Sequence, residues 1–347
     1  MKRALMIGFA LCALGCLGGY AKVPKSLLPT EKESAAMLRE ADDFIDELAD
    51  TPQDFQADAV LHSLYGHFGE LIQLRQSLNT PLKLSEGVEV LPVKGDGAAR
   101  GLNMRLYKPS KTDGKPMPLL VYFHGGGWTV GGLESCSTFC DALAATGSAM
   151  VLAVDYSLAP ERPYPAGMMD CVSAVEYVFA NASELGTSKE LISLGGDSAG
   201  GNLALATAMY MADSHPTDKI RSLVLFYPVV KAYNDKSASW KRYSRGYGLD
   251  GRLLEAYADA YVAKGDEKDP YVSPADADDS KLAALPPVLM VTAQQDILAD
   301  QGREFAARLK HADRVELPNT VHLFISRPGQ PTAFTKSVAL ASAFLKK

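Results

Sequence analysis

The sequence has little cysteine, and this scarcity excludes two kinds of small structural scaffold. Five cysteines occur in 347 residues, and only Cys136, Cys140 and Cys171 lie beyond residue 21. An odd number of cysteines argues against a disulfide framework, and no cysteine or histidine cluster has the spacing of zinc ligands. We therefore expect three buried free thiols and no metal site.

Basic blocks, internal repeats and low-complexity tracts are also missing. The formal net charge is −6, from 35 lysines and arginines against 41 aspartates and glutamates. Nucleic-acid binding requires clustered positive charge, so we expect no nucleic acid among the partners. Hydrophobic residues make up 47% of the chain, which is typical of a globular protein with a large core.

The first 21 residues are typical of a secretory leader. Two basic residues precede an apolar run over residues 4–17, and Gly19 and Ala21 occupy positions −3 and −1 of a cleavage site. The run is too short and too interrupted for a membrane span. We expect a signal peptide over residues 1–21 and a secreted or periplasmic protein.

A second interpretation of this leader stays open. Leu14-Gly15-Cys16 resembles a bacterial lipoprotein cleavage site, which would put a lipid anchor on Cys16. Ala13 is a poor match at the −3 position of that site. The lipoprotein is therefore the alternative to cleavage after Ala21.

Apolar runs alternate with helical patterns along the rest of the chain, which favours a mostly parallel sheet covered on both faces. We expect an α/β fold with eight strands. The strand-like runs are residues 88–93, 102–107, 118–123, 149–155, 191–194, 222–230, 288–293 and 314–317. The helical patterns are residues 31–50, 55–77, 165–181, 202–211, 300–310 and 332–346.

Two segments do not fit this alternation, and both are expected to form a helical cap. Residues 22–82 carry N-terminal helical patterns, and residues 83–347 are expected to form the main α/β domain. Within that domain residues 232–270 interrupt the alternation, with leucines and tyrosines at helical spacing. We expect this insertion to lie over the carboxyl edge of the sheet.

Gly196-Asp197-Ser198-Ala199-Gly200 is the most informative segment of the chain. It reads G-x-S-x-G between an apolar strand and an alanine- and leucine-rich helix. In this context a sharp, strained turn exposes a serine Oγ at the carboxyl end of the sheet. We therefore predict that Ser198 is a catalytic nucleophile.

A serine nucleophile needs a base and an acid that orients the base. Of the six histidines, His322 alone lies in a loop directly after an expected strand late in the chain. Asp296 directly follows the strand 288–293, 26 residues before His322. Asp300 is the rival acid, but we expect it to cap the helix that starts there. The predicted triad is Ser198, Asp296 and His322, in the chain order of α/β-hydrolases.

His124-Gly125-Gly126-Gly127-Trp128 follows the buried run 118–123. Ester hydrolysis builds negative charge on the carbonyl oxygen, and preset backbone N–H groups stabilise that charge. We predict an oxyanion hole made by Gly125, Gly126 and Ala199. Trp128 packs either near the site or in the core.

With these motifs in place, the sequence resembles the hormone-sensitive lipase family of α/β-hydrolases. The resemblance covers roughly residues 85–347 and is carried by motifs that stand in the family's order. These are H-G-G-G-W at 124–128, D-Y-x-L-A-P-E-x-x-x-P-A at 155–166, G-D-S-A-G-G-N at 196–202 and D-x-L-x-D at 296–300. The base motif departs slightly, with Leu323 where many members have glycine.

The resemblance implies hydrolysis of a carboxylic ester through an acyl-enzyme, without cofactor or metal. It also implies a small-molecule ester as substrate, a possible homodimer, and a supporting role for Glu161 near the oxyanion loop. We expect short acyl or acetyl esters. The alternatives are a lipase for longer chains, an amidase, and a ligand-binding protein on the same scaffold.

Overall fold

A computed structural model describes residues 23–49, 53–78 and 84–347. The predicted leader at residues 1–21, including the alternative anchor Cys16, lies outside them. Among the described helices, none combines the length and apolar character needed to cross a bilayer. Cys136, Cys140 and Cys171 are buried and free, as predicted.

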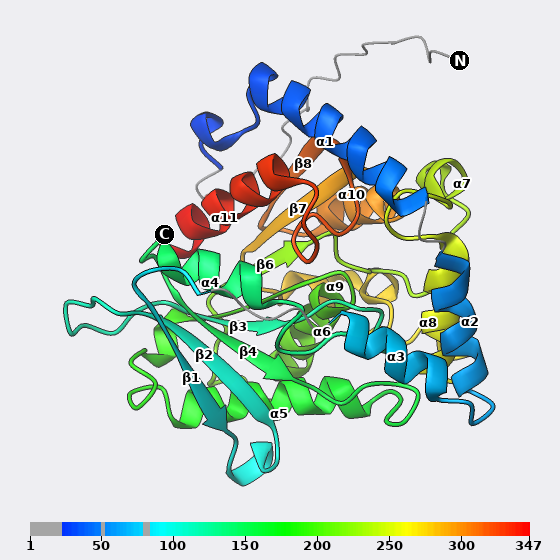
Figure 1. Cartoon of the computed structure of the whole chain (residues 1–347). Coiled ribbons are helices and arrows are strands. Elements are labelled where there is room, and N and C mark those ends of the chain that lie inside the picture. Colours follow the sequence, from blue (N-terminus) through cyan, green and yellow to red (C-terminus); the bar gives the residue numbers. More distant parts are fainter. Residues whose placement is uncertain (1–22, 50–52, 79–83) are drawn as a thin grey trace.

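An eight-stranded sheet forms the centre of the molecule, with strand order β1-β2-β4-β3-β5-β6-β7-β8 (Figure 1). β1 and β2 pair antiparallel with each other, β2 pairs antiparallel with β4, and every other pairing is parallel. The predicted fold class is therefore confirmed. The strands are β1 Val88–Lys94, β2 Asn103–Pro109, β3 Leu119–Phe123, β4 Met150–Asp155, β5 Ile192–Asp197, β6 Leu223–Phe226, β7 Val288–Gln295 and β8 Ala312–Val321.

Both faces of the sheet are buried, which explains why the central strands read as unbroken apolar runs. In β3, Leu119, Val121 and Phe123 face a core that also contains residues of α5, α6 and α10. Leu120 and Tyr122 face the opposite core, which contains residues of α4 and α11. Alternate side chains of one strand thus pack into two different cores.

The helices largely follow the predicted patterns, with one clear error. They are α1 Glu31–Ala49, α2 Gln53–Ser63, α3 Gly69–Ser77, α4 Ser137–Ala145, α5 Ala166–Ala180, α6 Ala199–Ser214, α7 Ala238–Tyr243, α8 Gly251–Tyr261, α9 Asp279–Ala283, α10 Ala299–Arg308 and α11 Pro331–Leu345. The single helix predicted over 55–77 is wrong, because a turn with Gly66 at φ +85° divides α2 from α3. β6 is also shorter than the predicted 222–230, and β8 is longer than 314–317.

The N-terminal helices lie against two different parts of the sheet domain (Figure 1). α1 packs along β8 and α11, whereas α2 packs on α8, which belongs to the segment 232–270. α1 begins with a capping box, in which Thr30 Oγ accepts from the Glu33 N–H at 3.2 Å and the Glu33 carboxylate accepts from the Thr30 N–H at 2.7 Å. Two segments distant in sequence therefore meet at α2 and α8.

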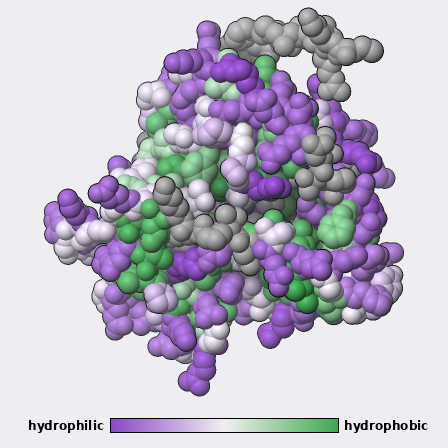
Figure 2. Space-filling view, viewed as in Figure 1, coloured by the Kyte–Doolittle hydropathy of each residue, from purple (hydrophilic) through white to green (hydrophobic). Residues whose placement is uncertain are grey.

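The face shown in Figure 2 is largely hydrophilic, with hydrophobic side chains gathered in a few places. Within the described ranges the exposed large hydrophobic residues number six, and four of them lie in α2, α3 or the turn between these helices. These four are Phe55, Leu64, Tyr65 and Ile72.

The turn from β5 into α6 crosses the end of β3 without room for a side chain at Gly200. A Cβ atom there would overlap the carbonyl oxygen of Phe123 and lie 2.5 Å from that of His124. Both are backbone atoms of a central strand and its exit loop, so neither can move cheaply.

We expect Gly200→Ala to lower the free energy of unfolding by about 3 kcal/mol, because the added methyl group overpacks this crossing. Urea unfolding followed by circular dichroism measures the change. Gly69→Ala is the matched control, since Gly69 is the first residue of α3 and nothing lies within 4 Å of its added Cβ. Equal stability of the two variants would contradict the close crossing.

Candidate active site

Ser198 stands at the tip of the turn between β5 and α6. Its backbone is in the left-handed region, with φ 54° and ψ −118°, a conformation that costs free energy in a residue other than glycine. Flanking hydrogen bonds hold it there: the Ser198 N–H donates to Phe226 O at 2.9 Å, and the N–H groups of Asn202 and Val229 donate to Ser198 O. The predicted strained turn is therefore present.

The structure brings Ser198, His322 and Asp296 into one hydrogen-bonded row. His322 Nε2 lies 3.1 Å from Ser198 Oγ, and His322 Nδ1 lies 2.6 Å from Asp296 Oδ2. In the tautomer that carries its proton on Nδ1, the ring donates to Asp296 and accepts from the serine hydroxyl. All three residues are buried, with His322 and Asp296 each 1% exposed.

Neighbouring backbone and ring contacts fix the acid and the base. Asp296 Oδ1 accepts from the Leu298 N–H at 2.9 Å, so both carboxylate oxygens are engaged. Gln330 donates to His322 O at 3.1 Å, and the Tyr227 ring centroid lies 4.3 Å from that of His322. Sequence reasoning missed Gln330 and Tyr227, because neither belongs to a recognisable motif.

Asp300, the rival acid, lies in the first turn of α10 and points elsewhere. Its Oδ2 accepts from the Ser239 N–H at 2.8 Å, and Oδ1 pairs with Arg303. The prediction that Asp300 caps this helix is wrong, since Leu298 is the N-cap residue. Asp300 instead connects α10 to α7.

The glycine loop follows β3 and lies beside the serine turn, because β3 and β5 are neighbours in the sheet. We call residues His124–Trp128 the oxyanion loop. The Gly125 N–H donates to Asp197 Oδ1 at 3.0 Å. This disagrees with the prediction that Gly125 is an oxyanion donor, because its only N–H is already used.

Three N–H groups near Ser198 remain without a partner. Gly126, Gly127 and Ala199 donate no hydrogen bond to any residue in 23–49, 53–78 or 84–347. Ala199 is the first residue of α6, where helix geometry leaves the N–H free of intrahelical partners. Gly126 and Ala199 were predicted as donors, whereas Gly127 was missed although it stands in the same motif.

Aromatic residues of α8 pack against the oxyanion loop. A Cβ atom at Gly127 would overlap the Tyr257 ring, so that ring lies directly on the glycine. The Trp128 and Tyr261 rings stack with centroids 4.6 Å apart, and Trp128 Nε1 donates to Asn202 Oδ1 at 3.3 Å. Both interpretations of Trp128 therefore hold, since it is buried and lies next to the loop.

Glu161 lies near the oxyanion loop through an arginine of α3. Arg75 forms an ion pair with Glu161 at 2.6 Å and also donates to Thr129 O at 2.8 Å and Ala159 O at 2.9 Å. Thr129 directly follows the loop. The resemblance implied a supporting role for Glu161. Through its ion pair with Arg75, Glu161 helps to hold the arginine that binds Thr129 O.

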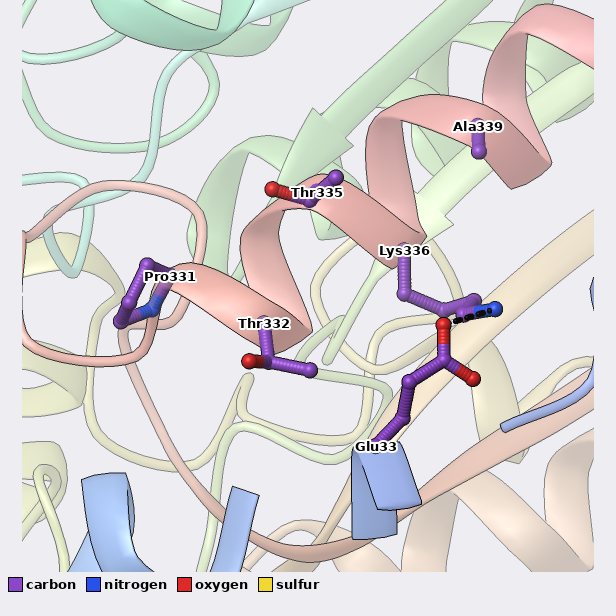
Figure 3. Close-up of a pocket in the computed structure, with 6 residues that line it drawn as sticks. All are labelled: Glu33, Pro331, Thr332, Thr335, Lys336 and Ala339. Atoms are coloured by element: carbon purple, nitrogen blue, oxygen red, sulfur yellow. Dashed lines mark ion pairs between the residues drawn. The ribbon is translucent and has the colours of Figure 1, made fainter. Parts of the chain in front are cut away.

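A surface pocket of about 400 Å³ lies away from the serine, between α1 and α11 (Figure 3). Thr332, Thr335 and Lys336 line it from α11, and Glu33 reaches across from α1 to pair with Lys336 at 2.7 Å. Lys336 and Thr30 lower the pKa of Glu33 to about 2. The ion pair joins the two helices, and the pocket includes no residue of the catalytic row.

Comparisons with known proteins agree with this arrangement. A family described as alpha/beta hydrolase fold matches residues 120–326. The chain is 36% identical over 253 residues to an arylesterase of Saccharolobus solfataricus, covering 71% of this chain and 79% of the relative. It is 34% identical over 230 residues to an ethyl acetate hydrolase of Pseudomonas putida, covering 65% and 71%.

The chain belongs to the α/β-hydrolase fold family. Among solved structures, the hyperthermophilic esterase of Pyrobaculum calidifontis superposes with a TM-score of 0.71 at 31% identity, over 88% of this chain and 96% of the neighbour. These relatives confirm the resemblance to the hormone-sensitive lipase family and the prediction of a carboxylic ester hydrolase at that general level.

His124, the first residue of the oxyanion loop, is fully buried, and burial lowers its pKa to about 4. Its Nδ1 lies 2.7 Å from Gly125 O, and its ring stacks on Tyr156 at 4.2 Å. The native protein therefore holds a neutral imidazole, while the unfolded chain protonates this side chain near pH 6.5.

We expect this difference to weaken the protein in acid. The pKa is lower in the folded state, so the stabilisation is complete above pH 6.5 and is lost as the pH falls toward 4. Between pH 7.5 and pH 4.5 the free energy of unfolding of the wild type should fall by about 2 kcal/mol more than that of His124→Asn. Urea unfolding of both proteins at the two pH values measures this. If the difference in free energy of unfolding between the two proteins were the same at both pH values, the folded state would not lower the pKa of His124.

Proposed function

We propose that the protein is a serine carboxylesterase that hydrolyses short-chain acyl or acetyl esters through an acyl-enzyme on Ser198. The observation that carries this proposal is the buried row from Ser198 Oγ through His322 to Asp296, at 3.1 Å and 2.6 Å. A hydroxyl within reach of an oriented imidazole is what activates a serine at neutral pH. The esterase relatives support the same reaction class.

In the first half of the reaction, Ser198 Oγ attacks the ester carbonyl while its proton moves to His322 Nε2. Asp296 stays ionised and stabilises the imidazolium through the Nδ1 hydrogen bond. When the tetrahedral intermediate collapses, His322 returns the proton to the leaving alcohol. In the second half, water attacks the acyl carbonyl while its proton moves to His322 Nε2. The bond between the acyl carbon and Ser198 Oγ then breaks, His322 returns the proton to Oγ, and the acid product leaves.

The negative charge on the tetrahedral oxygen requires donors that are in place before the reaction. We propose the N–H groups of Gly126, Gly127 and Ala199 for this role, with Gly127 replacing the predicted Gly125. The support for this choice is that Gly125 donates to Asp197, while the other three make no hydrogen bond within the described part of the chain.

We propose that α2, α3 and α8 form the cap over this site. The proposal is supported by the packing of α2 on α8 and of Tyr257 on Gly127. A cap in which α8 packs so closely on the loop suits small esters. The exposed Phe55, Leu64, Tyr65 and Ile72 are the feature that favours the alternative, a lipase for longer chains, because exposed apolar groups bind lipid surfaces. The exported location, the lipid anchor at Cys16 and the homodimer remain predictions.

A series of p-nitrophenyl esters from acetate to palmitate tests the substrate class. We expect kcat/KM to peak at acetate or butyrate, and we expect Ser198→Ala to lower kcat by a factor of about 10³ or more, because the nucleophile is lost. Circular dichroism of Ser198→Ala is the control for folding.

Each other outcome points to one alternative. A peak at long chains would make the protein a lipase. Matched p-nitroanilides hydrolysed at similar rates would indicate an amidase. A folded wild type with no turnover of any ester would leave a ligand-binding protein, and a folded Ser198→Ala with normal turnover would remove Ser198 from the mechanism.

The two acids of the motif at 296–300 give a second test. We expect Asp296→Asn to lower kcat by a factor of about 10³, because His322 loses the group that fixes its tautomer. Asp300→Asn should change kcat by less than about tenfold, since Asp300 contacts Ser239 and Arg303 rather than the histidine. Steady-state kinetics with p-nitrophenyl acetate measure both, and the reverse ranking would exchange the two roles.

A further inference from the structure

Asp197, the residue before the nucleophile, carries a buried carboxylate that the proposed reaction does not use. It is 1% exposed. Its Oδ1 accepts from Tyr122 O–H at 2.9 Å and from the Gly125 N–H at 3.0 Å. The same oxygen therefore binds one residue of β3 and one residue of the oxyanion loop.

The geometry leaves the loop little freedom at this point. A Cβ atom at Gly125 would overlap Asp197 Oδ2 and lie 2.9 Å from Asp197 O. Thus Asp197 Oδ1 accepts the Gly125 N–H, and Asp197 Oδ2 occupies the space beside the Gly125 Cα. Since Asp197 ends β5 and Ser198 comes directly after it, the loop is tied to the residue that adjoins the nucleophile.

The anchored N–H of Gly125 immediately precedes the proposed oxyanion donors of the loop. Gly126 and Gly127 come one and two residues after it in the chain. Gly126 has φ +118° and Gly127 has φ +56°, which glycine adopts without steric cost. A displaced Gly125 would move both donors relative to Ser198 Oγ.

A buried carboxylate at this place lowers the stability of the fold. A neutral side chain could fill the same space without that cost. Burial raises the pKa of Asp197 to about 6, against the lowering effect of the Tyr122 and Gly125 hydrogen bonds. Hydrogen bonds to a charged acceptor are stronger and more directional than those between neutral groups. The retained charge therefore favours a role in holding geometry.

We propose that Asp197 is a positioning residue that holds the oxyanion loop at its working distance from Ser198, through the bonds from Gly125 N–H and Tyr122 O–H. The inference rests on the proposed acyl-enzyme mechanism. The Asp197 carboxylate accepts from Tyr122 and Gly125 rather than from Ser198 or His322. It acts on the reaction only through the placement of the Gly126 and Gly127 N–H groups.

Three variants separate its effects. Asp197→Ala removes the acceptor, Asp197→Asn keeps an Oδ1 acceptor without the charge, and Tyr122→Phe removes one of the two donors. Asp141→Ala is the matched control, because Asp141 is also a buried carboxylate that accepts from one hydroxyl and one backbone N–H, both of Ser85. Asp141 lies in α4, and its partner Ser85 lies outside the oxyanion loop.

The measurements are kcat and KM with p-nitrophenyl acetate, and the Ki of a trifluoromethyl ketone. This inhibitor adds reversibly to Ser198 Oγ, whose proton moves to His322, and it places a negative oxygen in the oxyanion hole. Thermal unfolding reports stability separately. The inhibitor measures oxyanion stabilisation without leaving-group departure or deacylation.

For Asp197→Ala we expect kcat to fall by a factor of about 10², as when an oxyanion donor is lost. Ki should rise by a similar factor, while KM changes by less than about threefold, because ground-state binding does not use the oxyanion hole. Asp197→Asn should recover about tenfold of the loss, since its Oδ1 still accepts. Asp141→Ala should lower the melting temperature and leave kcat and Ki unchanged.

A folded Asp197→Ala with kcat and Ki close to wild type would overturn the inference. If Asp197→Ala does not fold, Tyr122→Phe decides, because an unchanged Ki in that variant would overturn it as well. If Ki rose equally in Asp197→Ala and in Asp141→Ala, the role of Asp197 would be structural only. Ser198→Ala separates this inference from the proposed function. Turnover close to wild type in Ser198→Ala defeats the function itself. A loss of turnover in Ser198→Ala, together with an Asp197→Ala as active as wild type, defeats only the role of Asp197.

Discussion

The site depends on the close crossing between the end of β3 and the turn from β5 into α6. Adjacent parallel strands end at the same edge, so the serine turn and the oxyanion loop leave the sheet side by side. Gly200 fits there only because it has no Cβ to meet the carbonyl oxygens of Phe123 and His124. A hydroxyl and a set of N–H donors can converge on one carbonyl only while this distance is kept.

The crossing concentrates costs that a stable fold would otherwise avoid. Ser198 has a left-handed backbone, Asp197 and Asp296 are buried carboxylates, and His124 is a buried neutral imidazole. The two apolar cores on either side of the sheet offset these costs, and the costs fall on residues that surround one point. These strained and buried polar groups lower the stability of the fold, and the packing around them fixes their positions, as is common at functional sites.

The sequence predicts those parts of the site whose chemistry and local structure coincide. Ser198 could be found because its turn demands small neighbours, and His322 and Asp296 because each follows a strand. Gly125 was misassigned, since which N–H of three consecutive glycines is free depends on Asp197, 72 residues away. The break between α2 and α3 was missed because helical patterns stand on both sides of Gly66, whose backbone turns there at φ +85°.

α8 contacts the oxyanion loop, and α2 contacts the segment that adjoins His322. Tyr257 of α8 lies on Gly127. Gln53 of α2 donates to Gly248 O at 2.8 Å and accepts from the Asp250 N–H at 2.7 Å. The backbone carbonyl oxygen of Tyr247, the residue before Gly248, accepts from the backbone N–H of His322 at 3.2 Å. A displacement of these helices would therefore shift the oxyanion loop and His322 together, so we expect sequence changes in them to alter the geometry on which the proposed reaction depends.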